Sequence, residues 1–171
     1  PIKEAVKKAI DENYSHYGSN RGLAKLRQIL SEQNARETGV TYDPETEVFI
    51  TSSGAEAINN AILAFVDEGD EVIIFTPAFV SYKNLVKFCG GVFVDLPLKK
   101  EDGFQIDPAA LEAAVTEKTK MIILNNPNNP TGAVYTRESL AAVAKIAVEH
   151  NLLVVSDEMY SKLTYEDARF T

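Results

Sequence analysis

Basic side chains, cysteine and long apolar runs are all scarce in this 171-residue sequence. Lysine and arginine total 17 against 25 aspartates and glutamates, and the resulting net charge of -8 excludes an electrostatic footprint for nucleic acid or an anionic membrane. No apolar run reaches the roughly 18 residues of a membrane span, and we see no signal-peptide pattern. The single cysteine, Cys89, excludes an internal disulfide and predicts a reducing, cytoplasmic setting.

Metal and nucleotide fingerprints are absent as well. The two histidines, His16 and His150, lie far apart, and no cysteine–histidine cluster has metal-ligand spacing, so we expect no metal. The sequence has no Gly-x-Gly-x-x-Gly motif, and no Walker lysine follows the turn at Ser53. A plain doubly wound nucleotide-binding domain remains an alternative, but the motifs that usually mark such a domain are missing.

The sequence does contain a regular alternation of helix and strand patterns, without internal repeats. Its length and its 45% hydrophobic residues suffice for one sizeable core. Amphipathic stripes predict helices at residues 3–12, 22–37, 53–66, 80–88, 107–115 and 136–150. Short apolar runs predict strands at 48–50, 72–75, 91–96, 121–124 and 152–155. Helices between strands form βαβ units, so we predict a three-layer α/β/α fold with a mainly parallel sheet.

Candidate site residues follow most of the predicted strands. In parallel α/β sheets, ligands bind at the carboxyl ends of the strands. The residues that come soon after such ends are Ser53, Phe79, Asn129, and Asp157 with Tyr160. We therefore expect these side chains to share one edge of the sheet.

The segment Ser53-Gly54-Ala55 is typical of an anion-binding turn at the start of a helix. Backbone N–H groups at a helix N-terminus point toward a bound anion, and the helix dipole favours negative charge there. The serine hydroxyl adds a donor. An ordinary serine N-cap followed by a turn glycine explains the same residues, so the pattern alone does not decide between the two.

Asp157 and Phe79 suit the nitrogen and the face of a heteroaromatic ring. Asp157 comes after the apolar run Leu152–Val155 and one serine, so we expect its carboxylate to be buried or nearly so, and a buried carboxylate needs a partner. A protonated ring nitrogen is such a partner, because each charge stabilises the other. Phe79 offers a surface for aromatic stacking. An N-cap role for Asp157 and core packing for Phe79 are the alternatives.

These segments resemble the aspartate aminotransferase family, the class I/II enzymes of fold type I that use pyridoxal 5'-phosphate. The resemblance covers the whole chain and rests on several motifs. They are the run 125–132 (Asn-Asn-Pro-Asn-Asn-Pro-Thr-Gly), Asp157-Glu158-Met159-Tyr160, Pro77-Ala78-Phe79, Ser53-Gly54-Ala55, and Tyr17 followed by Gly22-Leu23 and Leu26-Arg27.

The resemblance implies a role in cofactor binding for each motif. Ser53, Gly54 and Ala55 would hold the phosphate, and Phe79 would lie on the pyridine ring. Tyr17 would hydrogen-bond the phosphate of the neighbouring subunit, which implies a homodimer. Tyr82 is assigned to the substrate side.

The resemblance also implies the catalytic pair, Asp157 and Tyr160. Asp157 would keep the ring nitrogen protonated, so that the ring accepts electrons when the substrate loses its α-proton. Asn129 and Tyr160 would both contact the phenolate oxygen of the cofactor.

By the same resemblance, residues 1–171 are part of the large, cofactor-binding domain, without the N-terminal arm and the C-terminal part of the family fold. The Schiff-base lysine of the family follows a Ser-x-Ser-Lys-like loop, which this sequence lacks. The expected parent function is transfer of an α-amino group between amino acids and 2-keto acids, in amino acid metabolism. A pyridoxal-phosphate-dependent β-lyase or synthase of the same fold, and a non-catalytic aminotransferase-like regulatory module, are alternatives.

We predict that the 171-residue chain does not complete transamination, because the sequence has no lysine-bearing loop of that kind. Incubation with pyridoxal phosphate and an amino acid donor should yield no keto acid above a buffer control. Any cofactor should bind weakly and without a covalent bond to the protein. Borohydride treatment that fixes cofactor stoichiometrically to a single lysine would contradict this expectation.

Overall fold

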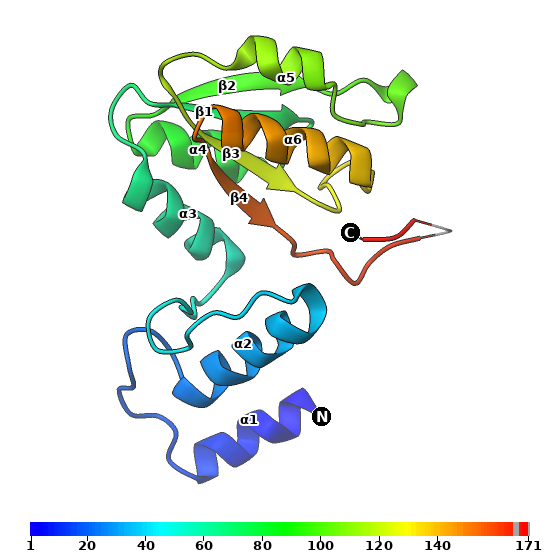
Figure 1. Ribbon diagram of the computed structural model, residues 1–171. Helices are drawn as coiled ribbons and strands as arrows, with labels where there is room; N and C mark the ends of the chain where they lie inside the picture. The colour runs from blue at the N-terminus through cyan, green and yellow to red at the C-terminus, as the bar shows by residue number, and fades with distance from the viewer. Residues whose placement is uncertain (166–167, 171) are drawn as a thin grey trace. The chain divides into compact units, whose positions relative to one another are not determined.

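The chain folds into two compact units. The structure, a computed structural model, describes residues 1–165 and 168–170. The first unit is Pro1–Ser52 and the second unit is Ser53–Thr171, and each makes most of its contacts within itself. The β-sheet belongs to the second unit (Figure 1).

The first unit contains two helices, α1 (Ile2–Asp11) and α2 (Ala24–Thr38), which confirm two helices predicted from the sequence. α1 has no buried residue, and its large apolar side chains are exposed. α2 ends at Gly39, whose φ of 78° is left-handed, the conformation that favours glycine after a helix.

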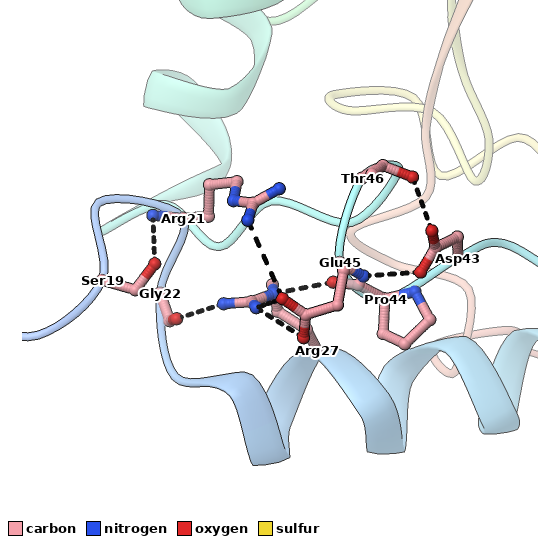
Figure 2. A network of polar contacts seen from close by, with 8 residues as sticks. All are labelled: Ser19, Arg21, Gly22, Arg27, Asp43, Pro44, Glu45 and Thr46. Atoms are coloured by element: carbon pink, nitrogen blue, oxygen red, sulfur yellow. Dashed lines mark hydrogen bonds and ion pairs between the residues drawn. The ribbon is translucent and has the colours of Figure 1, made fainter.

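A buried arginine, Arg27, ties the segments of the first unit together (Figure 2). Its side chain is only 2% exposed. The guanidinium donates to the Gly22 carbonyl at 2.5 Å, to the Pro44 carbonyl at 2.7 Å and to both carboxylate oxygens of Glu45 at 3.0 Å. The planar, five-donor fork of arginine suits two carbonyls and a bidentate carboxylate, which the point charge of lysine does not. The loop before α2 and the turn at 43–46 are therefore held to the first turn of the helix.

The strand predicted at 48–50 is wrong. Among the described residues they have no strand partner, and Phe49 is exposed. A backbone hydrogen bond from the Ile50 N–H to the Arg21 carbonyl, at 3.0 Å, holds the segment. The side chain of Ile50 lies against Gly22, where a Cβ would come within 2.4 Å of it and where φ is 87°. This left-handed glycine also explains why α2 begins two residues later than predicted.

The second unit is built on a four-stranded parallel sheet in the order β2-β1-β3-β4 (Figure 1). The strands are β1 (Glu71–Thr76), β2 (Val92–Pro97), β3 (Thr119–Asn125) and β4 (Leu153–Asp157), and they confirm the other four predicted strands. β1 and β3 lie in the centre. Their apolar residues are almost fully buried, because both faces of the sheet are covered.

Helices cover both faces of this sheet, which confirms the predicted three-layer α/β/α architecture. α3 (Gly54–Phe65) and α4 (Ser81–Phe88) pack on one face, against the even-numbered apolar residues of β1. α5 (Pro108–Ala114) and α6 (Arg137–Glu149) pack on the other face, against the odd-numbered ones. None of the described helices is long and apolar enough to cross a membrane.

The strand order creates a crevice between the carboxyl ends of β1 and β3. After β1 the chain moves outward to β2, and it then crosses back to β3 on the other side of β1. In open α/β sheets, such a reversal marks the place where ligands bind. The fold therefore points to the edge that the sequence motifs also indicate.

We predict that Arg27→Met lowers the unfolding free energy of the first unit by about 2–4 kcal/mol, because two buried carbonyls and a carboxylate lose their donor. Glu45→Gln should cost about 0.5–1 kcal/mol, since the Glu45 side chain is 61% exposed and glutamine keeps an acceptor. Hydrogen exchange of the α2 amides measures both effects. Equal losses of protection in the two variants would show that the arginine is not the central member of the network.

Candidate functional site

A cavity of about 200 Å³ lies at the carboxyl edge of the sheet in the second unit. Its lining comes from the start of α3, the segments after β1 and β3, and the end of β4. Seven of the eight predicted site residues line it, namely Ser53, Gly54, Ala55, Phe79, Asn129, Asp157 and Tyr160. The eighth, Tyr17, belongs to the first unit, where its side chain is fully exposed.

The N-terminus of α3 forms one end of the cavity. Ser53 is the N-cap of this helix, and its hydroxyl accepts the Glu56 N–H at 3.2 Å. The N–H groups of Gly54 and Ala55 open the helix, where an α-helix has no carbonyl acceptors of its own. The positive end of the helix dipole therefore faces the cavity. The N-cap and the anion-binding turn, which the sequence left as alternatives, are compatible in this geometry.

Asp157, the last residue of β4, presents a carboxylate that is held on both of its oxygens. Oδ2 accepts a hydrogen bond from the Tyr82 hydroxyl at 2.5 Å, and Oδ1 accepts the Met159 N–H at 3.1 Å. A carboxylate offers about four lone-pair positions, so these two bonds leave capacity for a ligand donor. Asp157 is partly buried, as its place just after an apolar run predicted.

A turn, not a helix, brings Tyr160 to the same cavity as Asp157. The spacing of three residues between them would also suit one turn of a helix. The structure instead closes a tight turn through a hydrogen bond from the Ser161 N–H to the Glu158 carbonyl at 3.0 Å. The spacing still places both side chains in the lining.

Tyr82, on α4, is a site residue whose role the sequence did not show. Its side chain is 1% exposed and its hydroxyl points at Asp157. Burial, and then the hydrogen bond to Asp157, raises the pKa of Tyr82 far above its ordinary value. The hydroxyl therefore keeps its proton and acts as a donor at neutral pH. A usable signal was the spacing of four residues between Tyr82 and Val86, which puts Tyr82 on the buried face of α4.

Asn125, at the end of β3, is a second residue of the cavity whose role the sequence did not show. Its side chain is buried, its amide nitrogen donates to the Asp157 carbonyl at 3.0 Å, and its amide oxygen accepts the Asn129 N–H at 2.7 Å. The Asn126 N–H donates to the same Asp157 carbonyl at 3.1 Å. One buried amide thus fixes the backbone of two predicted site residues relative to each other. The signal available was that Asn125 is the first polar residue after an apolar run.

The loop after β3 and the aromatic Phe79 complete the lining. The Asn129-Pro130 peptide bond is cis, as its sequence allowed. Phe79 packs edge-on against Tyr82, with ring centroids 5.6 Å apart and an interplanar angle of 78°. Phe79 also touches the apolar core on this face of the sheet. It therefore packs in the core, which was one of the two alternatives, and it also forms a wall of the cavity. Stacking on a ligand ring stays a prediction.

The cavity carries one charged side chain among its described lining residues, the carboxylate of Asp157. The opposite end offers backbone N–H groups. In the described ranges, no three or more His, Cys, Asp or Glu side chains gather as possible metal ligands. This charge pattern suits a small ligand with a cationic or N–H-bearing ring at one end and an anionic group at the other.

Comparison with known proteins identifies the family. The family model for aminotransferase class I and II matches residues 1–171. The chain belongs to this family. The predicted resemblance to class I/II aminotransferases is thereby confirmed.

Individual relatives agree with the family match. The aspartate/prephenate aminotransferase of Thermus thermophilus is 43% identical over 170 residues, which are 99% of this chain and 44% of that protein. The aspartate aminotransferase of Pyrococcus abyssi is 40% identical over 168 residues, covering 98% and 43%. The chain therefore spans less than half the length of the curated relatives it matches.

Solved structures of the family share the fold. N-succinyldiaminopimelate aminotransferase from Mycobacterium tuberculosis matches with a TM-score of 0.94 and 42% identity, over 99% of this chain and 44% of that one. An aromatic aminotransferase from Pyrococcus horikoshii OT3 matches with a TM-score of 0.95 and 43% identity, over 99% and 45%.

We predict that Tyr82→Phe lowers the unfolding free energy by about 1–2 kcal/mol, because a buried hydrogen bond to a carboxylate is lost. Tyr135→Phe is the matched control. Tyr135 is equally buried, and burial raises its pKa to about 12, but its hydroxyl, which lies near the Asn128 side chain, makes no hydrogen bond of good geometry to the described residues. The control should change stability by less than about 0.5 kcal/mol. Urea denaturation followed by circular dichroism distinguishes the two, and equal effects would contradict the assigned bond.

Proposed function

We propose that the cavity binds pyridoxal 5'-phosphate and that the chain is the cofactor-binding core of an aminotransferase. One observation carries this proposal. A single cavity combines the carboxylate of Asp157, the aromatic ring of Phe79 and the helix N-terminus at Ser53. These three groups suit the ring nitrogen, the ring face and the phosphate of the cofactor.

The donor set of the cavity also fits the phenolate oxygen of the cofactor. Asn129 and Tyr160 line the same space, and an amide and a phenol can both donate to a phenolate oxygen. No lysine, arginine or histidine is present in the described lining to compete for the carboxylate of Asp157. The fit therefore covers the ring nitrogen, the phenolate oxygen and the phosphate.

In this proposal the residues of the chain bind and orient. Asp157 holds a proton at the ring nitrogen, Phe79 covers one face of the ring and excludes water from it, and Asn129 with Tyr160 donates to the phenolate oxygen. The cofactor, when bound, supplies an electron sink for the α-carbon of an amino acid. Tyr17, in the first unit, would reach the phosphate of a second copy, so the parent enzyme would be a homodimer.

The parent reaction is proposed to be transfer of an α-amino group between amino acids and 2-keto acids. The relatives are named for different amino donors and acceptors, which include aspartate, prephenate and aromatic amino acids. Their names support the reaction class but select no single substrate. The free, partly buried Cys89 is in line with a reducing, cytoplasmic setting.

The described chain is proposed to be part of the large domain and to be inactive alone. Covalent attachment of the cofactor needs a lysine at the site, and the described cavity lining includes none. Cofactor binding to the 171-residue chain would therefore rest on hydrogen bonds, stacking and charge.

We predict that pyridoxal phosphate bound to this chain gives a saturable induced circular-dichroism band, because an achiral ring becomes held in a chiral pocket. Asp157→Asn, which preserves shape and removes the charge, should weaken binding about 10- to 100-fold. Asp102→Asn makes the same change of charge at an exposed site outside the cavity and should leave binding unchanged. Unaltered binding in Asp157→Asn, or equal losses in both variants, would sink the proposed contact with the ring nitrogen.

A further inference from the structure

The short contact between Tyr82 and Asp157 joins two elements that are far apart in the sequence. The hydroxyl lies 2.5 Å from Asp157 Oδ2, across 75 positions of the chain. Tyr82 comes from α4, whereas Asp157 ends β4. The bond therefore crosses the base of the cavity, from the helix layer to the sheet.

The ring of Tyr82 is anchored independently of its hydroxyl. It belongs to the buried apolar cluster under α3 and α4, which includes Ile58, Ile62 and Val86. A ring held in this way has little freedom to rotate, since protein cores are close-packed. The hydroxyl is thus delivered to Asp157 at a fixed position, and it does not follow the carboxylate if the carboxylate moves.

Tyr82 also contacts the aromatic wall of the cavity. The edge-on contact between its ring and Phe79, with centroids 5.6 Å apart, is a favoured arrangement of two aromatic side chains. A single buried residue therefore touches both the carboxylate and the flat surface that the proposed cofactor would meet.

We propose that Tyr82 is a positioning residue that sets the orientation of the Asp157 carboxylate and of the Phe79 ring for a bound heteroaromatic ring. This inference rests on the proposed function, since it assumes that such a ring enters the cavity. Tyr82 does not need to touch the ligand. Its contribution is to stop the carboxylate from rotating away from the ring nitrogen, so that the N–H···O⁻ pair forms without loss of side-chain freedom on binding.

The test uses the 171-residue chain and 4'-deoxypyridoxine 5'-phosphate labelled with nitrogen-15 in the ring. This analogue has no aldehyde, so it binds without reacting with any lysine. Its dissociation constant is measured by titration, and the nitrogen-15 chemical shift of the bound ring reports whether the nitrogen carries a proton. The variants are Tyr82→Phe, which removes only the hydroxyl, and Tyr135→Phe as the matched control.

Tyr82→Phe should weaken binding about five- to tenfold and move the ring-nitrogen shift toward that of the unprotonated base. Tyr135→Phe should change neither quantity. In an Asp157→Asn background, Tyr82→Phe should leave the ring-nitrogen shift unchanged, because the Tyr82 hydroxyl influences the ring nitrogen only through the charged carboxylate.

Three results would overturn the inference, and they can be told apart. Saturable binding by the unmodified chain, with an unchanged nitrogen shift in Tyr82→Phe, would overturn the positioning role alone. A shift change that is equally large in the Asp157→Asn background would do the same, because it would mean that Tyr82 acts by another route. Absence of saturable binding by the unmodified chain would instead overturn the proposed function, and the inference with it.

Discussion

The side chain of Asn125 sets the constraint on which the rest of the cavity depends. Its amide is buried at the end of β3, and it bridges the Asp157 carbonyl and the Asn129 N–H. Both contacts are to main-chain atoms, so they fix backbone positions whatever the rotamers of the two partners. A buried amide is costly unless both of its ends are satisfied, and this geometry satisfies both. These two contacts therefore hold the backbone at Asp157 and the backbone at Asn129 in a fixed position relative to each other.

Much of the second unit could be predicted from the sequence because its central strands are covered on both faces. Val72–Phe75 and Met121–Leu124 are continuous apolar runs, and only a buried parallel strand fits such runs between helical patterns. The segment at 48–50 looked similar over three residues and is no strand. The difference is the presence of a partner, since a strand exists only through hydrogen bonds to a neighbour, and local sequence does not reveal that neighbour.

The residues of the candidate site also fall into two groups, those that the local sequence could predict and those that depend on contacts across the fold. Ser53, Phe79, Asn129 and Asp157 could be predicted because each follows a strand, and the sheet gathers strand ends in one place. Tyr82 and Asn125 were not assigned their roles because these depend on contacts across the fold. Tyr82 reads as an apolar-face residue of a helix, and nothing nearby in the sequence tells that its hydroxyl meets a carboxylate 75 positions later. Sequence patterns indicated most of the groups proposed to contact a ligand, whereas the groups that hold them in place required the three-dimensional structure.

The burial of Tyr82 also restricts what chemistry this corner of the fold can carry. A phenol that retains its hydrogen throughout the neutral range donates a hydrogen bond to the carboxylate but does not take a proton from it. The pair is therefore unsuited to act as a relay, which requires a group that loses and regains a proton near the working pH. In the proposed enzyme, proton transfer at a reacting carbon would be carried by another group, while Tyr82 and Asp157 would form a static electrostatic anchor.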